Sequence, residues 1–262
     1  MPTWNASQYL QFADERTRPC RDLAARVGVE SPRSVIDLGC GPGNSTAVLR
    51  DRWPAAQIIG LDSSPEMIEA ARKSEPAGRW ELADIDQWAS AGPEQFDVVF
   101  SNAAMQWVAD HRAIFPKLAG RVKPGGALAV QMPGNLDEAA HTLMRELAAS
   151  PAWIDHFRGR SVREWHVHDP EFYYDVLSPH AARIDLWRTD YVHVMRDASA
   201  IVDWYRGTGL RPFLDSIGDD TGRRRFEADY LELVRQHYHP RADGRVLFPF
   251  RRIFFVAYRA GV

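Results

Sequence analysis

The sequence has little cysteine and almost no lysine. Cys20 and Cys40 are the two cysteines among 262 residues, which excludes a disulfide scaffold and a cysteine-rich metal site. There are three lysines and 29 arginines, and no lysine follows Lys123. Codon usage in a GC-rich genome would explain this bias. A need for guanidinium groups that bind planar anions would also explain it, and composition alone leaves both explanations open.

Long apolar runs and an excess of one charge are also missing. No run approaches the ~20 residues of a membrane helix, and the first residues lack a secretory pattern. The 32 basic and 35 acidic residues give a net charge of −3, which disfavours a general nucleic-acid binder. With 45% hydrophobic and 26% charged residues, the chain fits a globular protein. We expect a cytoplasmic protein with no nucleic-acid or membrane partner and one domain spanning 1–262.

Short buried strands alternate with helical segments along the first half of the chain. Strands are expected at 34–38, 58–62, 80–84, 96–101 and 127–132. This alternation predicts an α/β fold in which a parallel sheet has helices on both faces. Two later strands, near 184–195 and 251–259, are expected to complete a Rossmann-like, seven-stranded, mostly parallel sheet. We also expect Pro19 to divide residues 7–28 into two short helices and residues 123–126 to form a tight turn.

A glycine loop and two acids follow the first three predicted strands. The loop contains Gly39, Gly41 and Gly43, whose spacing differs from the G-x-G-x-x-G of dinucleotide-binding loops. Asp62 ends the second strand, where a carboxylate can accept both hydroxyls of a ribose. Asp84 ends the third strand, and Ile85 follows it, which suits the amino group and the face of an adenine. Because ligands of such sheets bind at the carboxyl ends of the strands, an adenosyl ligand is predicted there.

These residues resemble the class I S-adenosylmethionine-dependent methyltransferases. The resemblance implies S-adenosylmethionine as cofactor and an N-terminal helical segment, 1–30, that covers it. It also implies that Asn102 lies where cofactor and substrate meet. The cofactor-binding residues implied in this way are Arg16, Arg18, Asp37, Gly39, Gly41, Gly43, Asp62, Ser63, Met67, Asp84, Ile85 and Asn102.

The resemblance narrows to the trans-aconitate 2-methyltransferases. It is carried by Asp37–Thr46 (DLGCGPGNST), Leu61–Pro65 (LDSSP), Gln106–Val108 (QWV), Leu128–Pro133 (LAVQMP) and Thr208–Pro212 (TGLRP), and it spans nearly the whole chain except residues 150–168. It implies a small tricarboxylate substrate, converted to a monomethyl ester. Segments 136–178 and 197–240 are then expected to form an inserted helical cap for this substrate.

The implied reaction needs cations more than a general base, because a carboxylic acid is already ionised at pH 7. The expected catalytic residues are Asn102, Gln106 and Trp107, with Gln131 and Asn135 as weaker candidates. The expected substrate-binding residues are Arg188, Tyr191, His193, Arg211 and Arg251. His141, His166, His168 and His180 show no metal-ligand spacing and are interpreted as surface or capping residues.

Other functions remain open at this stage. The chain could methylate a different small acid or a malonyl group on a carrier protein. It could also bind S-adenosylmethionine without catalysis, or be a nicotinamide-dependent oxidoreductase, although the glycine spacing argues against the last. The oligomeric state cannot be predicted from the sequence.

Overall fold

A computed structural model describes residues 13–160, 162 and 165–261. The chain divides into two compact units. One, the sheet unit, takes in the described residues of Leu10–Gly134, Trp165–Thr189 and Arg252–Val262. The other, the helical unit, takes in those of Asn135–Glu164 and Asp190–Arg251. Residues 165–178, predicted as part of a cap, thus lie in the sheet unit, and residues 190–196 and 241–251 join the helical unit.

The sheet has seven strands in the order β3-β2-β1-β4-β5-β7-β6. The strands are β1 (Ser34–Leu38), β2 (Gln57–Asp62), β3 (Arg79–Leu82), β4 (Phe96–Asn102), β5 (Val122–Pro133), β6 (Arg183–Met195) and β7 (Val246–Tyr258). Strands β1 to β5 are parallel, and β7 is antiparallel to β5. The predicted α/β sheet is therefore confirmed, and its strand order reverses between β1 and β4, where such folds bind ligands.

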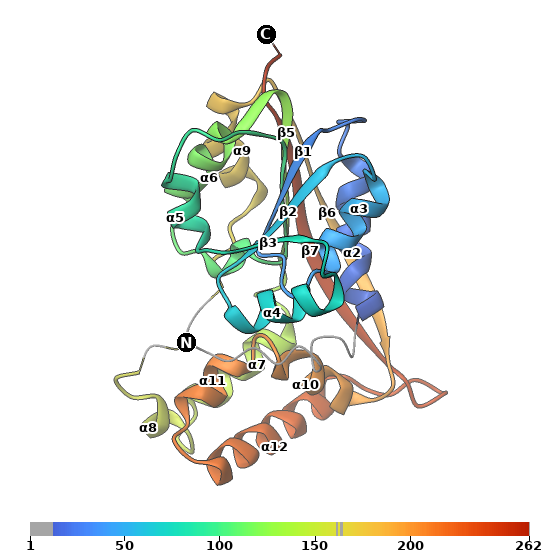
Figure 1. The fold of residues 1–262 in the computed structure, drawn as a ribbon. Coiled ribbons are helices and arrows are strands. Elements are labelled where there is room, and N and C mark those ends of the chain that lie inside the picture. The colour runs from blue at the N-terminus through green and yellow to red at the C-terminus, as the bar shows by residue number, and fades with distance from the viewer. Residues whose placement is uncertain (1–12, 161, 163–164, 262) are drawn as a thin grey trace. The chain divides into compact units, whose positions relative to one another are not determined.

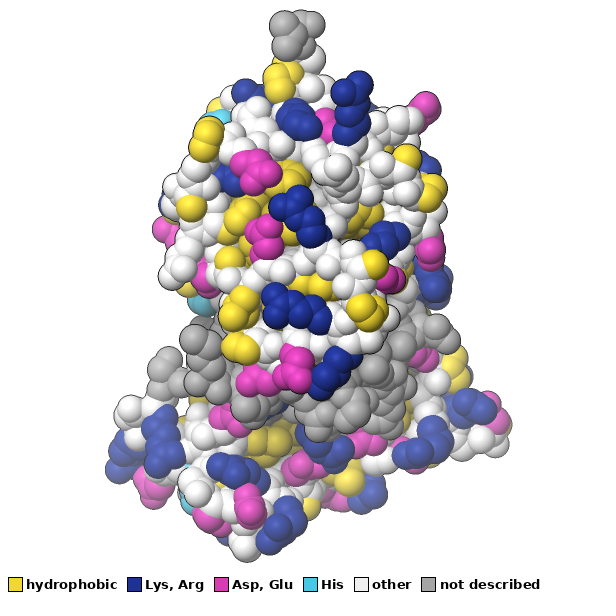
Figure 2. All heavy atoms as spheres, viewed as in Figure 1, with side chains coloured by type: hydrophobic (Ala, Val, Ile, Leu, Met, Phe, Trp, Pro, Cys, Tyr) yellow, Lys and Arg dark blue, Asp and Glu magenta, His cyan; other side chains and the backbone are white. Residues whose placement is uncertain are grey.

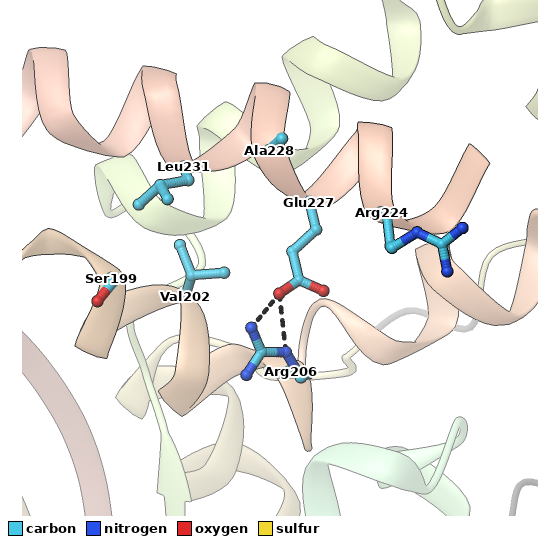
Figure 3. Close-up of a pocket in the computed structure, with 7 residues that line it drawn as sticks. All are labelled: Ser199, Val202, Arg206, Arg224, Glu227, Ala228 and Leu231. Atoms are coloured by element: carbon cyan, nitrogen blue, oxygen red, sulfur yellow. Dashed lines mark hydrogen bonds and ion pairs between the residues drawn. The ribbon is translucent and has the colours of Figure 1, made fainter. Parts of the chain in front are cut away.

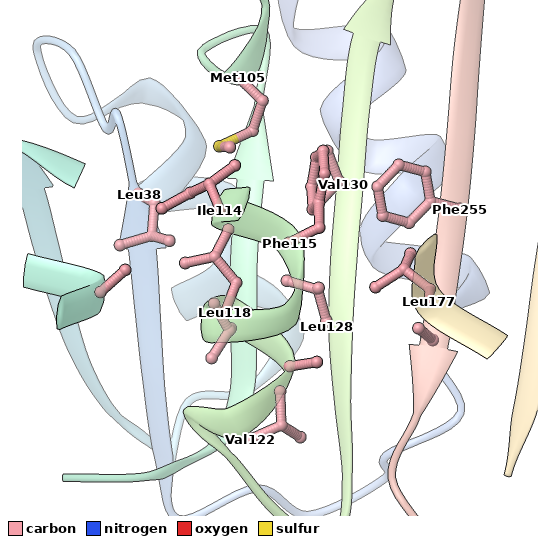
Figure 4. Packing of buried hydrophobic residues seen from close by; sticks show 14 of the residues in the cluster. Leu38, Met105, Ile114, Phe115, Leu118, Val122, Leu128, Val130, Leu177 and Phe255 are labelled. Atoms are coloured by element: carbon pink, nitrogen blue, oxygen red, sulfur yellow. The ribbon is translucent and has the colours of Figure 1, made fainter. Parts of the chain in front are cut away.

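Helices lie on both sides of the sheet. In Figure 1, α5 (Ile85–Ser90), α6 (His111–Gly120) and α9 (Pro170–Leu177) lie on one side, with α2 (Ala13–Arg26) and α3 (Asn44–Arg52) on the other. The remaining elements of this unit are α4 (Pro65–Ser74) and the 3-10 turns η1 (Met105–Trp107) and η2 (Ser178–His180). Figure 4 shows Ile114, Phe115 and Leu118 of α6 packed with Leu128 and Val130 of β5. This core holds the strand ends in fixed positions.

Two local predictions were wrong in detail. Pro19 lies inside the continuous helix α2, so residues 13–26 form one helix. The missing N–H costs a hydrogen bond, but Pro19, Cys20 and Leu23 are buried, and this packing stabilises the helix. Residues 123–126 belong to β5, yet pairing with β4 jumps from Val122 to Ala127. The expected turn is thus an irregularity within a strand.

The helical unit contains α7 (Ala139–Ala149), α8 (Ile154–Phe157), α10 (Ala198–Arg206), α11 (Arg211–Ser216) and α12 (Asp220–His237). Its interior is aromatic, since Trp153, Tyr205, Phe226 and Tyr230 are fully buried. The Tyr230 hydroxyl donates to the Ala140 carbonyl at 2.9 Å, which ties α12 to α7. Among the described residues, no helix is long and apolar enough to cross a membrane. Basic and acidic side chains are interspersed on the face shown in Figure 2.

Candidate active site at the carboxyl ends of the strands

The glycine loop after β1 contacts the loop after β4. Gly39, Gly41 and Gly43 all have positive φ angles, of 72°, 55° and 97°. A Cβ on Gly39 would lie 2.2 Å from the Ala104 Cβ, so only glycine fits there. A Cβ on Gly41 would meet no atom of the described residues within 4 Å. The loop is therefore tightly packed at Gly39 and open at Gly41, at the point where the strand order reverses.

Asp37 anchors this loop from inside the sheet unit. Its side chain is fully buried, and its Oδ2 accepts hydrogen bonds from Ser45 Oγ and Thr46 Oγ1, both at 2.6 Å. Its Oδ1 has no partner among the described residues. Burial raises the pKa of Asp37 to about 6, although the two hydroxyl donors oppose this shift. At neutral pH Asp37 thus presents a buried carboxylate oxygen that is available to accept from a cationic group.

Asp62 holds the other side of the loop. Its Oδ2 accepts from the Gly41 N–H and its Oδ1 from the Ser64 N–H, both at 2.9 Å. Burial raises its pKa, while these backbone donors act in the opposite direction. Ser64 caps α4 by accepting from the Met67 N–H. Because Ser64 caps α4, the Asp62 carboxylate is not needed as a helix cap. It lies directly beside Gly41.

The remaining predicted adenosine residues lie near the starts of α4 and α5. Asp84 is the N-cap of α5, and its Oδ1 accepts from the Asp86 and Gln87 N–H groups. Ile85 reaches to 4.0 Å from the Cβ position of Gly39. Met67 is buried and Ser63 is exposed. The structure thus brings Ile85 to the glycine loop and gives Asp84 a capping role that sequence reasoning missed.

The loop after β4 is strained. Ala103 has a φ of 55°, the only positive value at a described residue other than glycine, and such strain is characteristic of functional sites. The neighbouring Asn102 has a buried Oδ1 without a partner among the described residues. Gln106 is buried, and its Nε2 donates to the Ala103 carbonyl at 2.8 Å. Its Oε1 has no such partner, so an acceptor remains available.

Trp107 and the segment that follows residue 164 pack together. The rings of Trp107 and Trp165 are perpendicular, with centroids 5.7 Å apart. The His166 N–H donates to the Gln106 carbonyl at 2.8 Å, so this segment is tied to the turn that carries Gln106. Sequence reasoning missed this contact, because residues 150–168 carried no recognisable periodicity or motif.

A buried histidine supports the same turn and was also missed. His111 Nε2 lies 2.9 Å from the Met105 carbonyl, and its Nδ1 lies 2.9 Å from the Tyr173 hydroxyl. A carbonyl only accepts, so Nε2 carries the proton and Nδ1 accepts from Tyr173. Burial lowers the pKa of His111 to about 4. A neutral His111 therefore fixes Met105, the first residue of η1.

Comparison with known proteins identifies the family. A methyltransferase-domain family model matches residues 35–126. Trans-aconitate 2-methyltransferases of Azoarcus sp. (strain BH72) and Methylobacterium radiotolerans are each 49% identical, and each match covers 99% of this chain and 100% of the relative. The chain belongs to the trans-aconitate 2-methyltransferase family. A Bacillus halodurans structure shares the fold, with a TM-score of 0.61 at 12% identity over 93% of this chain and 99% of that one.

The substrate residues expected for a trans-aconitate 2-methyltransferase are divided between the two units. Tyr191 and His193 are buried, and His193 packs against Trp204 and Phe250 within the helical unit. Arg188 belongs to the sheet unit, where it forms an ion pair with Asp169 at 2.8 Å. Alternation along β6 places Arg188 with the exposed residues rather than with Tyr191 and His193.

Two predicted arginines lie in the helical unit. Arg211 begins α11, and its side chain is 19% exposed with Nε 3.4 Å from Asp215 Oδ2. Arg251 has three acidic neighbours, at 3.1 Å from Asp137 and 3.2 Å from Asp190, with Glu138 at 3.9 Å. The charge of Arg251 is therefore largely neutralised by its own chain.

The N-terminal segment is described only in part. Arg16 is buried on α2, and Arg18 is exposed. Residues 1–12 of the expected covering segment lie outside the described residues. The role of both arginines toward a cofactor stays a prediction.

His141 corrects one prediction. It was interpreted as a surface or capping residue, but it is 6% exposed, with its ring 4.9 Å from that of Tyr205. It lies on the buried side of α7, where burial lowers its pKa to about 3. Among the described residues, no group of three or more His, Cys, Asp or Glu residues could hold a metal ion.

A pocket of about 270 Å³ lies between α10 and α12 of the helical unit (Figure 3). Its walls include Val202 and Leu231, and its Arg206 already binds Glu227. None of the predicted site residues lines it. We therefore place the candidate active site at the strand ends and not in this pocket.

Proposed function

We propose that the chain transfers a methyl group from S-adenosylmethionine to a carboxylate of trans-aconitate, which gives a monomethyl ester. The observation that carries this proposal is the extent of the family similarity. It runs through the helical unit as well as residues 35–126, the part matched by the methyltransferase domain. A shared donor-binding fold alone would explain similarity only in the sheet unit.

The residues at the strand ends fit S-adenosylmethionine. The open face of Gly41 leaves room for a ligand against the backbone, and Asp62 beside it suits ribose hydroxyls. Asp37 Oδ1 and Asn102 Oδ1 are buried acceptors without partners among the described residues, which suits an ammonium group. We assign the adenine to Asp84 and Ile85, flanked by Met67, with Ser63 beside the ribose and Arg16 or Arg18 toward the methionine carboxylate.

Catalysis in this proposal depends on alignment. When bound, the cofactor supplies a methyl group made electrophilic by the sulfonium. The acceptor carboxylate is ionised at pH 7, so no side chain has to remove a proton. Asn102, Gln106 and Trp107 would align the sulfonium methyl with the acid and exclude water, and both effects accelerate such a transfer.

The non-reacting carboxylates of a tricarboxylate need cationic partners. Arg211 is the arginine we assign to this role, because its side chain is mostly buried and it lies in the Thr208–Pro212 segment that carries the family resemblance. Arg251 is the weaker candidate, since three acids surround it. For Arg188, Tyr191 and His193 a substrate contact remains the proposal, as does a cap formed by segments 136–178 and 197–240.

Incubation with methyl-labelled S-adenosylmethionine and trans-aconitate tests the proposal. Labelled monomethyl ester is the expected product. A panel of other small di- and tricarboxylates and a malonyl-loaded carrier protein should be turned over much more slowly. Faster turnover of another acid would replace the substrate. Cofactor binding without turnover of any acid would favour a non-catalytic binder. The cytoplasmic location is likewise a proposal, and fractionation of the producing cells would test it.

A further inference from the structure

Two buried polar side chains lie at the carboxyl end of β5 and on the strand beside it. Gln131 is fully buried, and Arg252 is 4% exposed. Gln131 pairs in register with Asn102 on β4 and with Phe254 on β7, and Arg252 pairs with Pro133. The Gln131 carbonyl accepts from the N–H of the strained Ala103. Both side chains therefore belong to the same strand ends as the candidate active site.

The orientation of the Gln131 amide is fixed by its neighbour. Arg252 Nη1 lies 3.4 Å from Gln131 Oε1. A guanidinium has donors and no acceptor, so the oxygen of the amide, and not its nitrogen, must face Arg252. The Nε2 group then points away from Arg252, and it has no hydrogen-bond partner among the described residues. Buried donors of this kind are rare in folded proteins and call for an explanation.

We propose that Gln131 is a further catalytic residue, which donates from Nε2 to the carboxylate that receives the methyl group. Arg252 is a positioning residue that acts through Gln131 by holding the amide oxygen. This proposal rests on the proposed function for the nature of the acceptor. It gives Gln131, a weaker candidate in the sequence, a defined donor atom and a partner that holds it.

The neighbouring amides show why a carboxylate is the expected ligand. Gln106 uses its Nε2 on the Ala103 carbonyl, so the atom left available is an acceptor, Oε1. Asn102 has a buried Oδ1 without a partner among the described residues. These two amide oxygens suit the cationic part of the cofactor. The carboxylate that receives the methyl group is anionic, so it needs a hydrogen-bond donor. Of these three neighbouring amides, only Gln131 has a buried donor nitrogen without a partner among the described residues.

Substitution of Gln131 by methionine tests the donor while nearly preserving volume. For Gln131→Met we expect kcat/KM for trans-aconitate to fall about 10- to 100-fold, as for loss of a hydrogen bond to a charged group. Gln131→Glu should be worse still, because a carboxylate there repels the acid. The Kd of S-adenosylhomocysteine, measured by calorimetry, should change less than about twofold in Gln131→Met if the donor serves the acid alone.

Arg252 and a matched arginine provide the control. Arg252→Gln should lower kcat/KM in the wild-type background and have little further effect in Gln131→Met, because it acts through Gln131. Arg121 is also buried, and it donates to the Ala91 and Gly92 carbonyls, next to the amino end of β5. Arg121→Gln should lower the melting temperature without changing the KM for the acid.

Several outcomes would overturn the proposal. One is unchanged acid kinetics in Gln131→Met, and another is weakened cofactor binding with unaltered acid affinity, which would assign the donor to the methionine carboxylate. If Gln131→Met does not fold, the acid kinetics and the Kd of S-adenosylhomocysteine are measured for Gln131→Glu instead. If the wild type turns over no trans-aconitate, the proposed function fails. In that case the Kd of small acids for the complex with S-adenosylhomocysteine is measured instead. The inference holds only if Gln131→Met raises this Kd.

Discussion

The two units differ in how far their polar side chains are paired within the chain. In the sheet unit, buried oxygens and one buried nitrogen at neighbouring strand ends have no partner among the described residues, on Asp37, Asn102, Gln106 and Gln131. In the helical unit, the buried oxygens of Asn135 and Ser150 also lack such a partner, but the prominent charged groups are already matched. Arg206 binds Asp203 and Glu227, and Arg251 has three acidic neighbours.

This difference indicates a ligand site at the strand ends of the sheet unit and a surface of paired charges on the helical unit. A buried polar atom that lacks a partner costs about 1–3 kcal/mol, so several together are retained where a ligand completes them. An exposed arginine paired with an acid contributes little to stability and indicates no ligand. The arginine-rich composition is thus a poor guide to the substrate, while the strand ends are a good guide to the cofactor.

The largest expected effect is at Gly39. Gly39→Ala adds a methyl group 2.2 Å from the Ala104 Cβ at a positive φ. We expect the free energy of unfolding to fall by about 3 kcal/mol or more, from overpacking together with backbone strain. Cofactor binding should be lost as well. Urea denaturation and calorimetry with S-adenosylhomocysteine measure the two effects.

Gly41→Ala is the matched control, because a similar φ penalty applies without a clash with any described residue. It should cost only about 1–2 kcal/mol of stability, yet still weaken cofactor binding if a ligand occupies the open face of the loop. Equal destabilisation by the two variants would contradict the assignment of packing to Gly39 and of ligand contact to Gly41.

Much of the sheet unit could be predicted from the sequence for a local reason. Alternating strands and helices predict the parallel sheet, and glycines and acids that end strands must then gather at one edge. Pro19 shows where this reasoning fails. Its intrinsic preference favours a helix break, but burial on α2 decides the outcome.

The substrate side could not be predicted equally well, because the partners of an arginine are set by tertiary contacts. Arg251 resembled a free cation in the sequence, yet Asp137, 114 residues earlier, is one of its partners. His111 illustrates the opposite error, because it belongs to no charge pattern and only its hydrogen bond connects it to the active-site turn. Gln131 was a weaker candidate in the sequence, and only its hydrogen bonds show which of its atoms is available.

The next largest effect is expected from the buried histidine of the helical unit. The pKa of His141 is lowered from 6.5 to about 3 in the folded chain, so the unfolded chain binds the proton more readily. Stability should therefore decrease as the pH falls below about 6.5, by at most about 1.4 kcal/mol per pH unit from this group. In His141→Gln this part of the pH dependence should disappear, as urea denaturation at pH 7 and pH 5 would measure.

His237→Gln serves as its control, because His237 is exposed on α12 of the same unit. It should leave the pH dependence of unfolding as in the wild type. If both variants behaved alike, acid sensitivity would have to arise outside the buried face of α7.

A smaller effect, on substrate binding alone, is expected at Arg211. Arg211→Lys should raise the KM for trans-aconitate by about one to two orders of magnitude, because an ammonium cannot form a bidentate contact with a carboxylate. The affinity for S-adenosylhomocysteine should not change. Arg251→Lys, in which the substituted group keeps three acidic neighbours, should shift the KM much less, and an equal shift would place both arginines at the substrate.

The smallest and most selective effect is expected from the acid beside Arg211. Asp215 Oδ2 lies 3.4 Å from Arg211 Nε, and both residues belong to α11. If Arg211 binds a substrate carboxylate, Asp215 competes for the same guanidinium. Asp215→Asn should then lower the KM for trans-aconitate by about two- to fivefold, as expected when a partly exposed ion pair worth less than about 1 kcal/mol is removed. A raised KM would instead mean that Asp215 orients Arg211, and the helical unit would then hold a prearranged substrate site like that of the sheet unit.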